Sequence, residues 1–276
     1  MQTFKQQCIA LRKQDCSLNE IAEITGRPKT SVYTHIRDIP LSAKKKKQIQ
    51  KMARERIVAA ARFRKGKSTR SFTEFSTWTP KHTLLVAHLF FDGDLMSSKC
   101  IYNNRSTALT KRVEKLMGLV YAYEPKRSLD KDSEVYRISY YNVALSSYLK
   151  KKSDELIRIV HTLHTESKKE FLRAFFDDEG CMDFRIAQHV RQIRGYQKDK
   201  KILLLIQLLL KDFNIQSRVA EPNEIVISGR ENLVTFQNEI NFSSGVTVNG
   251  KRTNSVWGIS LQKKEILAQA IASFKT

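Results

Sequence analysis

Two acidic residues, each directly followed by glycine, end two similar apolar segments of the sequence. The segments 85–93 (LVAHLFFDG) and 172–180 (LRAFFDDEG) align without gaps, and their acids are Asp92 and Glu179. Carboxylate oxygens are ligands that Mg²⁺ prefers, and metal ions held between carboxylates commonly drive phosphodiester hydrolysis. Both acids are therefore candidate metal ligands and catalytic residues, with Mg²⁺ as the expected ion and Mn²⁺ as an alternative.

Both segments have the pattern of a helix that ends at a glycine, here Gly93 and Gly180. Ala87 and Ala174 each precede the acid by five residues, and a small side chain there lets two helix backbones approach closely. The two acids would then lie side by side at the negative ends of two helix dipoles, which costs about 0.3–1 kcal/mol each before their mutual repulsion. Such a pair favours a bound cation. Because the motifs are separated by the length of a small domain, the sequence also predicts a duplication.

With these two motifs, residues 80–276 resemble the LAGLIDADG homing endonucleases, in the single-chain form that carries two motif helices. The resemblance implies motif helices that pack at the centre and last acids, here Asp92 and Glu179, that bind the catalytic metals. Asp177 stands where the family often has an earlier acid, whereas Phe90 occupies that place in the first motif. Both motifs have Ala where the family name spells Gly, and His88 interrupts the first apolar stripe.

The fold class expected from the resemblance is α+β, with tandem αββαββα halves over residues 80–165 and 166–276. Together they would form a pseudo-symmetric saddle on DNA, preceded by a small all-α module. The patterns predict a strand over 134–141, a strand-like segment over 181–196, a hairpin over 216–228, and helices over 106–117, 200–213, 229–240 and 261–274. The helix over 200–213 is apolar almost all round, which predicts a buried helix. The first half is expected to lack one strand.

Side chains of the types that read base edges in a major groove gather on these predicted strands. They are Arg185, Gln188, Arg191, Gln192 and Arg194 in the second half, with Arg137 on the polar side of the strand in the first. The resemblance also implies a lysine near the scissile phosphate in each half. Lys251, and less clearly Lys150 to Lys152, are the candidates for that role.

Residues 1–41 have the pattern of three short helices. Ser17 and Glu20 form a capping box at the start of the second helix, and Gly26 provides the turn before the third, which runs from about residue 28 to 37. This order predicts a helix-turn-helix whose last helix enters a major groove. Its exposed DNA-binding set would be Lys29, Thr30, Ser31, Tyr33, Thr34 and Arg37. The alternative is a three-helix bundle with an incidental polar face.

Residues 42–79 form a basic connector. Between residues 44 and 70 there are twelve Lys or Arg residues against the single acid Glu55. Apolar residues keep helical spacing through part of this segment, which predicts a helix with a basic face. Such a helix would follow a phosphate backbone without sequence preference, although a solvated linker has the same composition.

The whole chain of 276 residues has a formal charge of +21 and a sequence pI of about 9.9, which predicts a partner with dense negative charge. Its four cysteines show neither metal-ligand spacing nor a disulfide framework. The first residues lack the apolar core of a signal peptide, and the apolar run 202–210 is too short to span a bilayer. We therefore expect a cytoplasmic, nucleoid-associated protein with no membrane partner.

The leading functional hypothesis is a metal-dependent, site-specific endonuclease that cuts both strands of DNA and acts as a monomer, because both half-sites lie on one chain. One alternative is a DNA-binding transcriptional regulator that keeps the scaffold without cutting. Another is an intron-RNA maturase, because the same basic surface would bind structured intron RNA.

Overall fold

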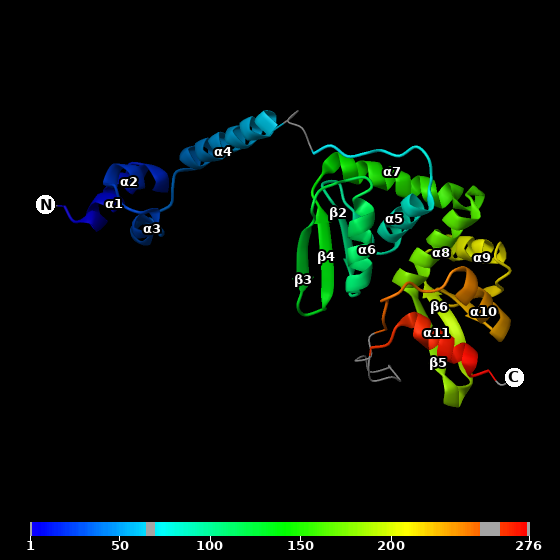
Figure 1. Cartoon of the computed structure of the whole chain (residues 1–276). Coiled ribbons are helices and arrows are strands. Elements are labelled where there is room, and N and C mark those ends of the chain that lie inside the picture. Colours follow the sequence, from blue (N-terminus) through cyan, green and yellow to red (C-terminus); the bar gives the residue numbers. More distant parts are fainter. Residues whose placement is uncertain (1, 65–69, 249–259, 275–276) are drawn as a thin grey trace. The chain divides into compact units, whose positions relative to one another are not determined.

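The computed structural model describes residues 2–64, 70–248 and 260–274. The chain forms two compact units, one on either side of residues 65–69, and each is described by itself (Figure 1). Within the described residues, no helix is both long and apolar enough to cross a membrane.

The first unit begins with three short helices: α1 (Phe4–Lys13), α2 (Leu18–Thr25) and α3 (Lys29–Ile36). Their shared core consists of Cys8, Ile21, Val32 and Ile36, all buried. The predicted capping box is confirmed, because the Ser17 hydroxyl accepts from the Glu20 amide and the Glu20 carboxylate accepts from the Ser17 amide. Gly26 then adopts a left-handed conformation with φ of 64° and ends α2, as predicted.

The basic segment forms a single long helix, α4 (Ala43–Arg64). The start of α4 is tied to the three-helix core: Lys45 pairs with Glu20 at 2.8 Å, and Asp15 accepts from the Ser42 amide at 2.8 Å. From residue 46 to residue 61 every side chain of α4 is exposed. The helix therefore buries no face within its own unit.

Residues 70–79, which the sequence interpretation assigned to the basic connector, pack on the second unit instead. The Phe75 amide donates to the Tyr148 hydroxyl at 2.7 Å, and the Trp78 indole donates to Glu155 at 2.7 Å. The reason is the change in composition after residue 70, where Phe72, Phe75 and Trp78 provide apolar area that the basic helix lacks. The connector thus ends before residue 70.

The second unit contains the same αββαββα order twice. The first half consists of α5 (Pro80–Phe91), β1 (Gly93–Leu95), β2 (Cys100–Asn104), α6 (Thr107–Met117), β3 (Lys126–Asp130), β4 (Val135–Tyr140) and α7 (Val143–Ile159). After a short 3₁₀ turn, the second half consists of α8 (Thr165–Glu179), β5 (Gly180–Arg185), β6 (Val190–Tyr196), α9 (Lys200–Lys211), β7 (Ser217–Ala220), β8 (Glu224–Ser228) and α10 (Arg230–Glu239), followed by α11 (Lys263–Ala272).

Each half builds a four-stranded antiparallel sheet with the same topology, β1-β2-β4-β3 in the first and β5-β6-β8-β7 in the second. The predicted fold class is therefore confirmed, but the expectation that the first half lacks a strand is wrong. Strand β1 has only three residues, which is too short to show an alternating pattern. The strand-like segment 181–196 is likewise a hairpin of two strands, β5 and β6.

Helices α5 and α8 pack directly against each other in the middle of the second unit (Figure 1). Leu85 and Ala87 on α5, and Leu172 and Ala174 on α8, are fully buried there. The prediction that α9 is buried all round is wrong, because Leu204 and Leu208 are about half exposed. One face of α9 covers the second sheet, and its other face has no partner among the described residues.

Candidate metal centre at the ends of α5 and α8

The seam between α5 and α8 is closely packed at the small residues that the motifs provide. Ala87 and Ala174 have no exposed surface, as the sequence predicted for a close approach of the two helices. Towards the ends of the helices, the Phe91 ring packs on Phe175 with ring centroids 5.2 Å apart and on Phe171 at 5.4 Å. The seam thus fixes where each helix ends, and with it the place of the two motif acids.

Both motif glycines follow the acid at the point where helix becomes strand. Gly180 has an extended conformation, with φ of −96°, so it does not act as a left-handed cap. A Cβ atom at Gly93 would lie 2.2 Å from the carbonyl oxygen of Leu89, and one at Gly180 would lie 2.5 Å from that of Phe176. Glycine is required here because the strand passes too close to the helix end for any side chain.

Asp92 and Glu179 occupy these helix ends and influence each other electrostatically. Burial raises the pKa of Asp92 to about 7, and the charges of Asp178 and Glu179 contribute to the increase. Burial, together with the charge of Asp178, also raises the pKa of Glu179 to about 7, although Lys263 opposes this. Both carboxylates are therefore poorly stabilised as anions, a common property of functional sites.

The neighbouring acids differ from this pair because each has a partner that donates to it. Asp177 accepts from Arg112 at 3.1 Å and from the Ser243 amide at 2.9 Å. Asp178 pairs with His88 at 2.8 Å and accepts from the Tyr102 hydroxyl at 2.7 Å.

The motif acids themselves lack a cationic partner. Asp92 accepts only from the neutral amide of Asn104, at 2.5 Å, and the Glu179 carboxylate has no hydrogen bond or ion pair within the described part of the chain. Two buried acids without a counter-cation are thus left at the centre of a basic protein.

Lys263 is a residue near this site that sequence reasoning missed. It lies at the start of α11, is buried, and donates from Nζ to the carbonyl oxygens of Phe176 at 3.2 Å and Asp177 at 2.7 Å. Burial lowers its pKa, and the charge of Asp177 opposes this most strongly. The signal was its spacing, because Lys263 continues the buried stripe of Ile266, Leu267 and Ala270.

His88 also differs from the sequence expectation of a simple break in an apolar stripe. Burial alone would lower its pKa, but the charge and hydrogen bond of Asp178 outweigh burial, so the pKa of His88 is raised. His88 therefore belongs to a polar cluster across the seam.

Asp92 and Glu179 fit a hard divalent cation by donor chemistry, because both offer carboxylate oxygens and neither has a competing cation. Among the residues that the structure describes, no group of three or more His, Cys, Asp or Glu side chains is arranged to hold a metal ion. Mg²⁺ is commonly bound through one or two carboxylates together with substrate phosphates and waters. The chain therefore provides part of a coordination sphere, and a phosphate-bearing partner would have to complete it.

The predicted base-reading residues of the second half divide between two faces of the hairpin. Arg185, Gln192 and Arg194 lie on the face opposite the buried residues Met182 and Ile193. There Asp183 accepts from Arg185 at 2.9 Å and from Arg194 at 3.4 Å. Gln188 lies in the connecting turn, Ile186–Gln188, and is exposed.

Arg191 requires a correction, because it lies on the other face of β6. Its guanidinium donates to the Ser273 hydroxyl at 2.6 Å and to the Ser273 carbonyl at 3.1 Å, and it lies over the Phe274 ring. Alternation along the strand places Arg191 with the core residue Ile193 rather than with Arg194. It secures the end of α11 and does not accompany the other arginines.

The remaining predicted DNA-binding side chains are exposed, although this alone does not test their role. Arg137 lies on β4 and donates to Asn103 at 2.8 Å. The six predicted side chains of the third helix are all exposed around the buried pair Val32 and Ile36: Lys29, Thr30, Ser31, Tyr33, Thr34 and Arg37.

The predicted catalytic lysines are not supported by the structure. Lys251 lies outside the described residues. Lys150 to Lys152 lie within α7 and not in a loop, which corrects the expectation. Lys152 pairs with Glu155 at 2.9 Å and lies over the rings of Phe75 and Trp78, so its charge is used in packing residues 70–79.

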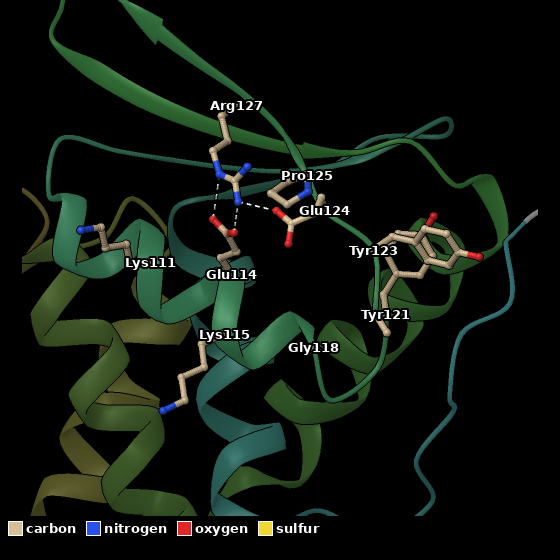
Figure 2. Close-up of a pocket in the computed structure, with 10 residues that line it drawn as sticks. Lys111, Glu114, Lys115, Gly118, Tyr121, Tyr123, Glu124, Pro125 and Arg127 are labelled. Carbon is tan, nitrogen blue, oxygen red and sulfur yellow. Dashed lines mark hydrogen bonds and ion pairs between the residues drawn. The ribbon is translucent and has the colours of Figure 1, made fainter.

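A groove on the surface of the first half lies apart from the motif acids. Figure 2 shows its lining, which comes from the end of α6, the segment after it and β3. Arg127 in this groove pairs with both Glu114 and Glu124, so its charge is neutralised within the chain. None of the predicted site residues lines this groove.

The tandem αββαββα halves, with motif helices packed at the centre, define a LAGLIDADG-type fold. Residues 166–241 match the family model described as the LAGLIDADG-like domain. The second half is therefore a LAGLIDADG-like domain, and the resemblance predicted from the motifs is confirmed. No curated protein matches the chain.

Solved structures with similar folds come from two kinds of protein. Mesophilic variants of the homing endonuclease I-DmoI are 15% identical over 60% of this chain and 91% of that one, with a TM-score of 0.47. I-DmoI in complex with its target DNA in the presence of Mg is also 15% identical, over 58% and 95%, with a TM-score of 0.46. Full-length DUF199/WhiA from Thermatoga maritima is 17% identical over 74% of this chain and 63% of that one, with a TM-score of 0.49.

Proposed function

We propose that the protein is a metal-dependent, site-specific endonuclease of double-stranded DNA. The observation that carries this proposal is the placement of Asp92 and Glu179. They lie at the ends of two packed motif helices, with pKa values raised to about 7 and no cationic partner among the described side chains. A purely structural pair of acids would be expected to have partners, as Asp177 and Asp178 have.

Duplex DNA fits the rest of the molecule by charge. The formal charge of +21 includes a helix, α4, whose basic side chains are exposed and unpaired from residue 46 to residue 61 in the described structure. Exposed arginines of β5 and β6 lie on one face of the second sheet, and polar side chains cover the exposed face of α3. Phosphate contacts from α4 would provide affinity, while side chains on the sheet and on α3 would contact bases.

The chemistry follows from which residues are free. Asp92 and Glu179 would hold divalent cations, which, when bound, activate water and stabilise the departing 3′ oxygen. Arg112 and Lys263 keep the Asp177 carboxylate and the end of α8 in place. Because each half of the chain contributes one acid, we expect each acid to serve one DNA strand and the protein to act as a monomer.

The experiment is incubation of the purified chain with a randomised plasmid library and Mg²⁺, followed by sequencing of the ends. Discrete double-strand breaks that disappear in Asp92→Asn and in Glu179→Gln are expected. Asp130→Asn provides the matched control, since Asp130 is an exposed acid at the far end of β3, and should leave cleavage intact. Tight duplex binding without breaks in Mg²⁺ or Mn²⁺ would contradict the proposal.

A non-cleaving DNA-binding regulator is the second candidate, favoured by a specific observation. The three-helix unit with its exposed α3 can bind DNA by itself, and Asp178 brings a third carboxylate close to the motif acids without increasing the number of free ligands. In that case the library experiment would give binding alone. Preference for folded intron RNA over duplex DNA would instead indicate a maturase.

A further inference from the structure

A polar cluster crosses the α5–α8 seam close to Asp92. Nδ1 of His88 on α5 lies 2.8 Å from Oδ2 of Asp178 on α8, and the Tyr102 hydroxyl on β2 donates to Oδ1 of the same carboxylate at 2.7 Å. The side chains of His88 and Asp178 are fully buried, and Tyr102 has no exposed surface. Three elements of the second unit therefore meet at one carboxylate.

The cluster continues to the motif acid through Asn104. Its Nδ2 donates to Oδ2 of Asp92 at 2.5 Å and lies 3.3 Å from the Tyr102 hydroxyl. Its Oδ1 accepts from the Ser106 amide at 2.8 Å, which fixes the NH₂ end of the amide towards Asp92. An unbroken chain of polar contacts thus leads from His88 to Asp92.

The corresponding place in the other half is apolar. In the aligned motifs His88 corresponds to Phe175, and Asp178 corresponds to Phe91. Where His88 pairs with Asp178, Phe91 and Phe175 instead pack edge to face with ring centroids 5.2 Å apart.

The strands show the same difference. Tyr102 pairs in register with Gly93, and Gly195 pairs with Gly180, so Tyr102 corresponds to Gly195. A Cβ at Gly195 would lie 2.5 Å from the Phe175 ring, so the aromatic contact fills the space that Tyr102 occupies in the first half. One contact type is therefore polar on the Asp92 side and aromatic on the other.

Stability alone does not explain this asymmetry. A buried polar network is generally no more stable than apolar packing of similar volume, because its groups must be removed from water. The seam itself demonstrates an apolar solution in Phe91, Phe175 and Gly195. What distinguishes the polar version is that it ends on Asp92, whereas Glu179 has no hydrogen-bond partner in the described chain.

We propose that His88, Asp178, Tyr102 and Asn104 form a positioning network that orients Asp92 as a metal ligand, and that the two metal sites are consequently inequivalent. The inference rests on the proposed function and deepens it. Groups that orient metal ligands typically change metal affinity or activity by about 10–100-fold when removed. The DNA strand served by Asp92 therefore depends on the network, whereas the strand served by Glu179 does not.

The first test measures Mn²⁺ binding to the full chain from the electron paramagnetic resonance signal of free Mn²⁺. Tyr102→Phe, which keeps the ring, should weaken one of two sites by about 10-fold or more and leave the other unchanged. Tyr140→Phe is the matched control, because the Tyr140 hydroxyl is buried in the same sheet without a hydrogen-bond partner among the described residues. Asn104→Ala, at a half-buried position, provides a second variant if Tyr102→Phe does not fold.

The second test follows each strand of a duplex that the wild-type protein cuts, with a separate label on each strand. His88→Leu should slow one strand by about 10-fold or more. His88→Asn, whose side-chain amide can donate where Nδ1 lies, should restore it. Phe175→Leu, the equivalent position in the apolar contact, should not change the ratio of the two rates.

The outcomes distinguish the two proposals. If the wild-type protein binds Mn²⁺ and cuts DNA, but Tyr102→Phe and His88→Leu retain both sites and the same ratio of strand rates, the positioning network is disproved and the nuclease function stands. A wild-type chain that neither binds Mn²⁺ nor cuts would overturn both.

Discussion

The Nζ atom of Lys263 lies 2.7 Å from the carbonyl oxygen of Asp177, so a buried lysine from the last helix closes the end of α8 beside Glu179. The last carbonyls of a helix have no partner within the helix and carry its negative dipole. A cation there stabilises the helix end without occupying the carboxylate of Glu179. The motif acid therefore remains free while its backbone is held.

Lys263→Met is expected to destabilise the second unit by about 1–3 kcal/mol, because it leaves the two carbonyl oxygens without their charged donor. For a unit of this size, that lowers the melting temperature by about 2–4 °C per kcal/mol, measurable by calorimetry. Lys264→Met is the control on the same helix, since Lys264 reaches only the exposed Ser244. Equal losses in both variants would show that the buried contact has no special role.

Stability should fall with rising pH in the absence of divalent metal. The pKa values of Asp92 and Glu179 are raised to about 7 in the folded chain, so the folded state binds more protons than the unfolded state between about pH 4 and pH 7. Over that window the free energy of unfolding decreases, and the full penalty remains above about pH 7. Melting temperatures across the pH range, compared with those of Asp92→Asn, measure this contribution.

Mg²⁺ should remove much of that penalty above about pH 7 and have little effect near pH 4, where the acids are protonated. Asp92→Asn should melt higher than the wild-type protein by a few degrees without metal at about pH 8, because one repelling charge is gone. Its response to Mg²⁺ should be smaller than that of the wild-type protein. A higher stability of the wild-type protein at pH 8 than at pH 5 without metal would contradict the account.

Gly195→Ala tests the aromatic side of the seam. The added Cβ would lie 2.5 Å from the Phe175 ring, so we expect a loss of about 1–3 kcal/mol by overpacking. Phe175→Leu should relieve part of that clash, and a double-mutant cycle measured by chemical denaturation would show the coupling. Additive losses would mean that the two residues do not contact as described.

The exposed helix α4 should govern the salt dependence of DNA binding. Lys46→Gln combined with Lys51→Gln removes two exposed charges, and the slope of log affinity against log salt should become shallower by about 0.9 for each phosphate that is no longer neutralised. Lys201→Gln combined with Lys211→Gln changes the charge equally on α9 and should alter the slope little. Fluorescence anisotropy with a short duplex is sufficient. Identical slopes in both double variants would contradict a phosphate-binding role for α4.

Local signals in the sequence predicted the helices and the motif acids well. The capping box of Ser17 and Glu20 and the left-handed Gly26 depend only on neighbouring residues, so they were visible in the sequence. Ala87 and Ala174 indicated the close seam because small residues serve few other purposes at that place in a helix.

Long-range relationships were not predictable in the same way. The pairing of His88 with Asp178 joins residues on different motif helices, and each side chain alone resembled a departure from the family pattern. Lys263 looked like one charge among many until the fold buried it. Arg191 and Arg194 lie three residues apart, but the pleat of β6 sends them to opposite faces.

The central claim is that Asp92 and Glu179 together hold divalent metal against a DNA duplex. The most direct measurement is the anomalous scattering of Mn²⁺ in crystals of the full chain with a duplex recovered from the library experiment. The account predicts Mn²⁺ peaks at coordination distance, about 2.0–2.2 Å, from an oxygen of each of the two acids. Carboxylates that face apart in the complex, with no Mn²⁺ at either, would contradict it.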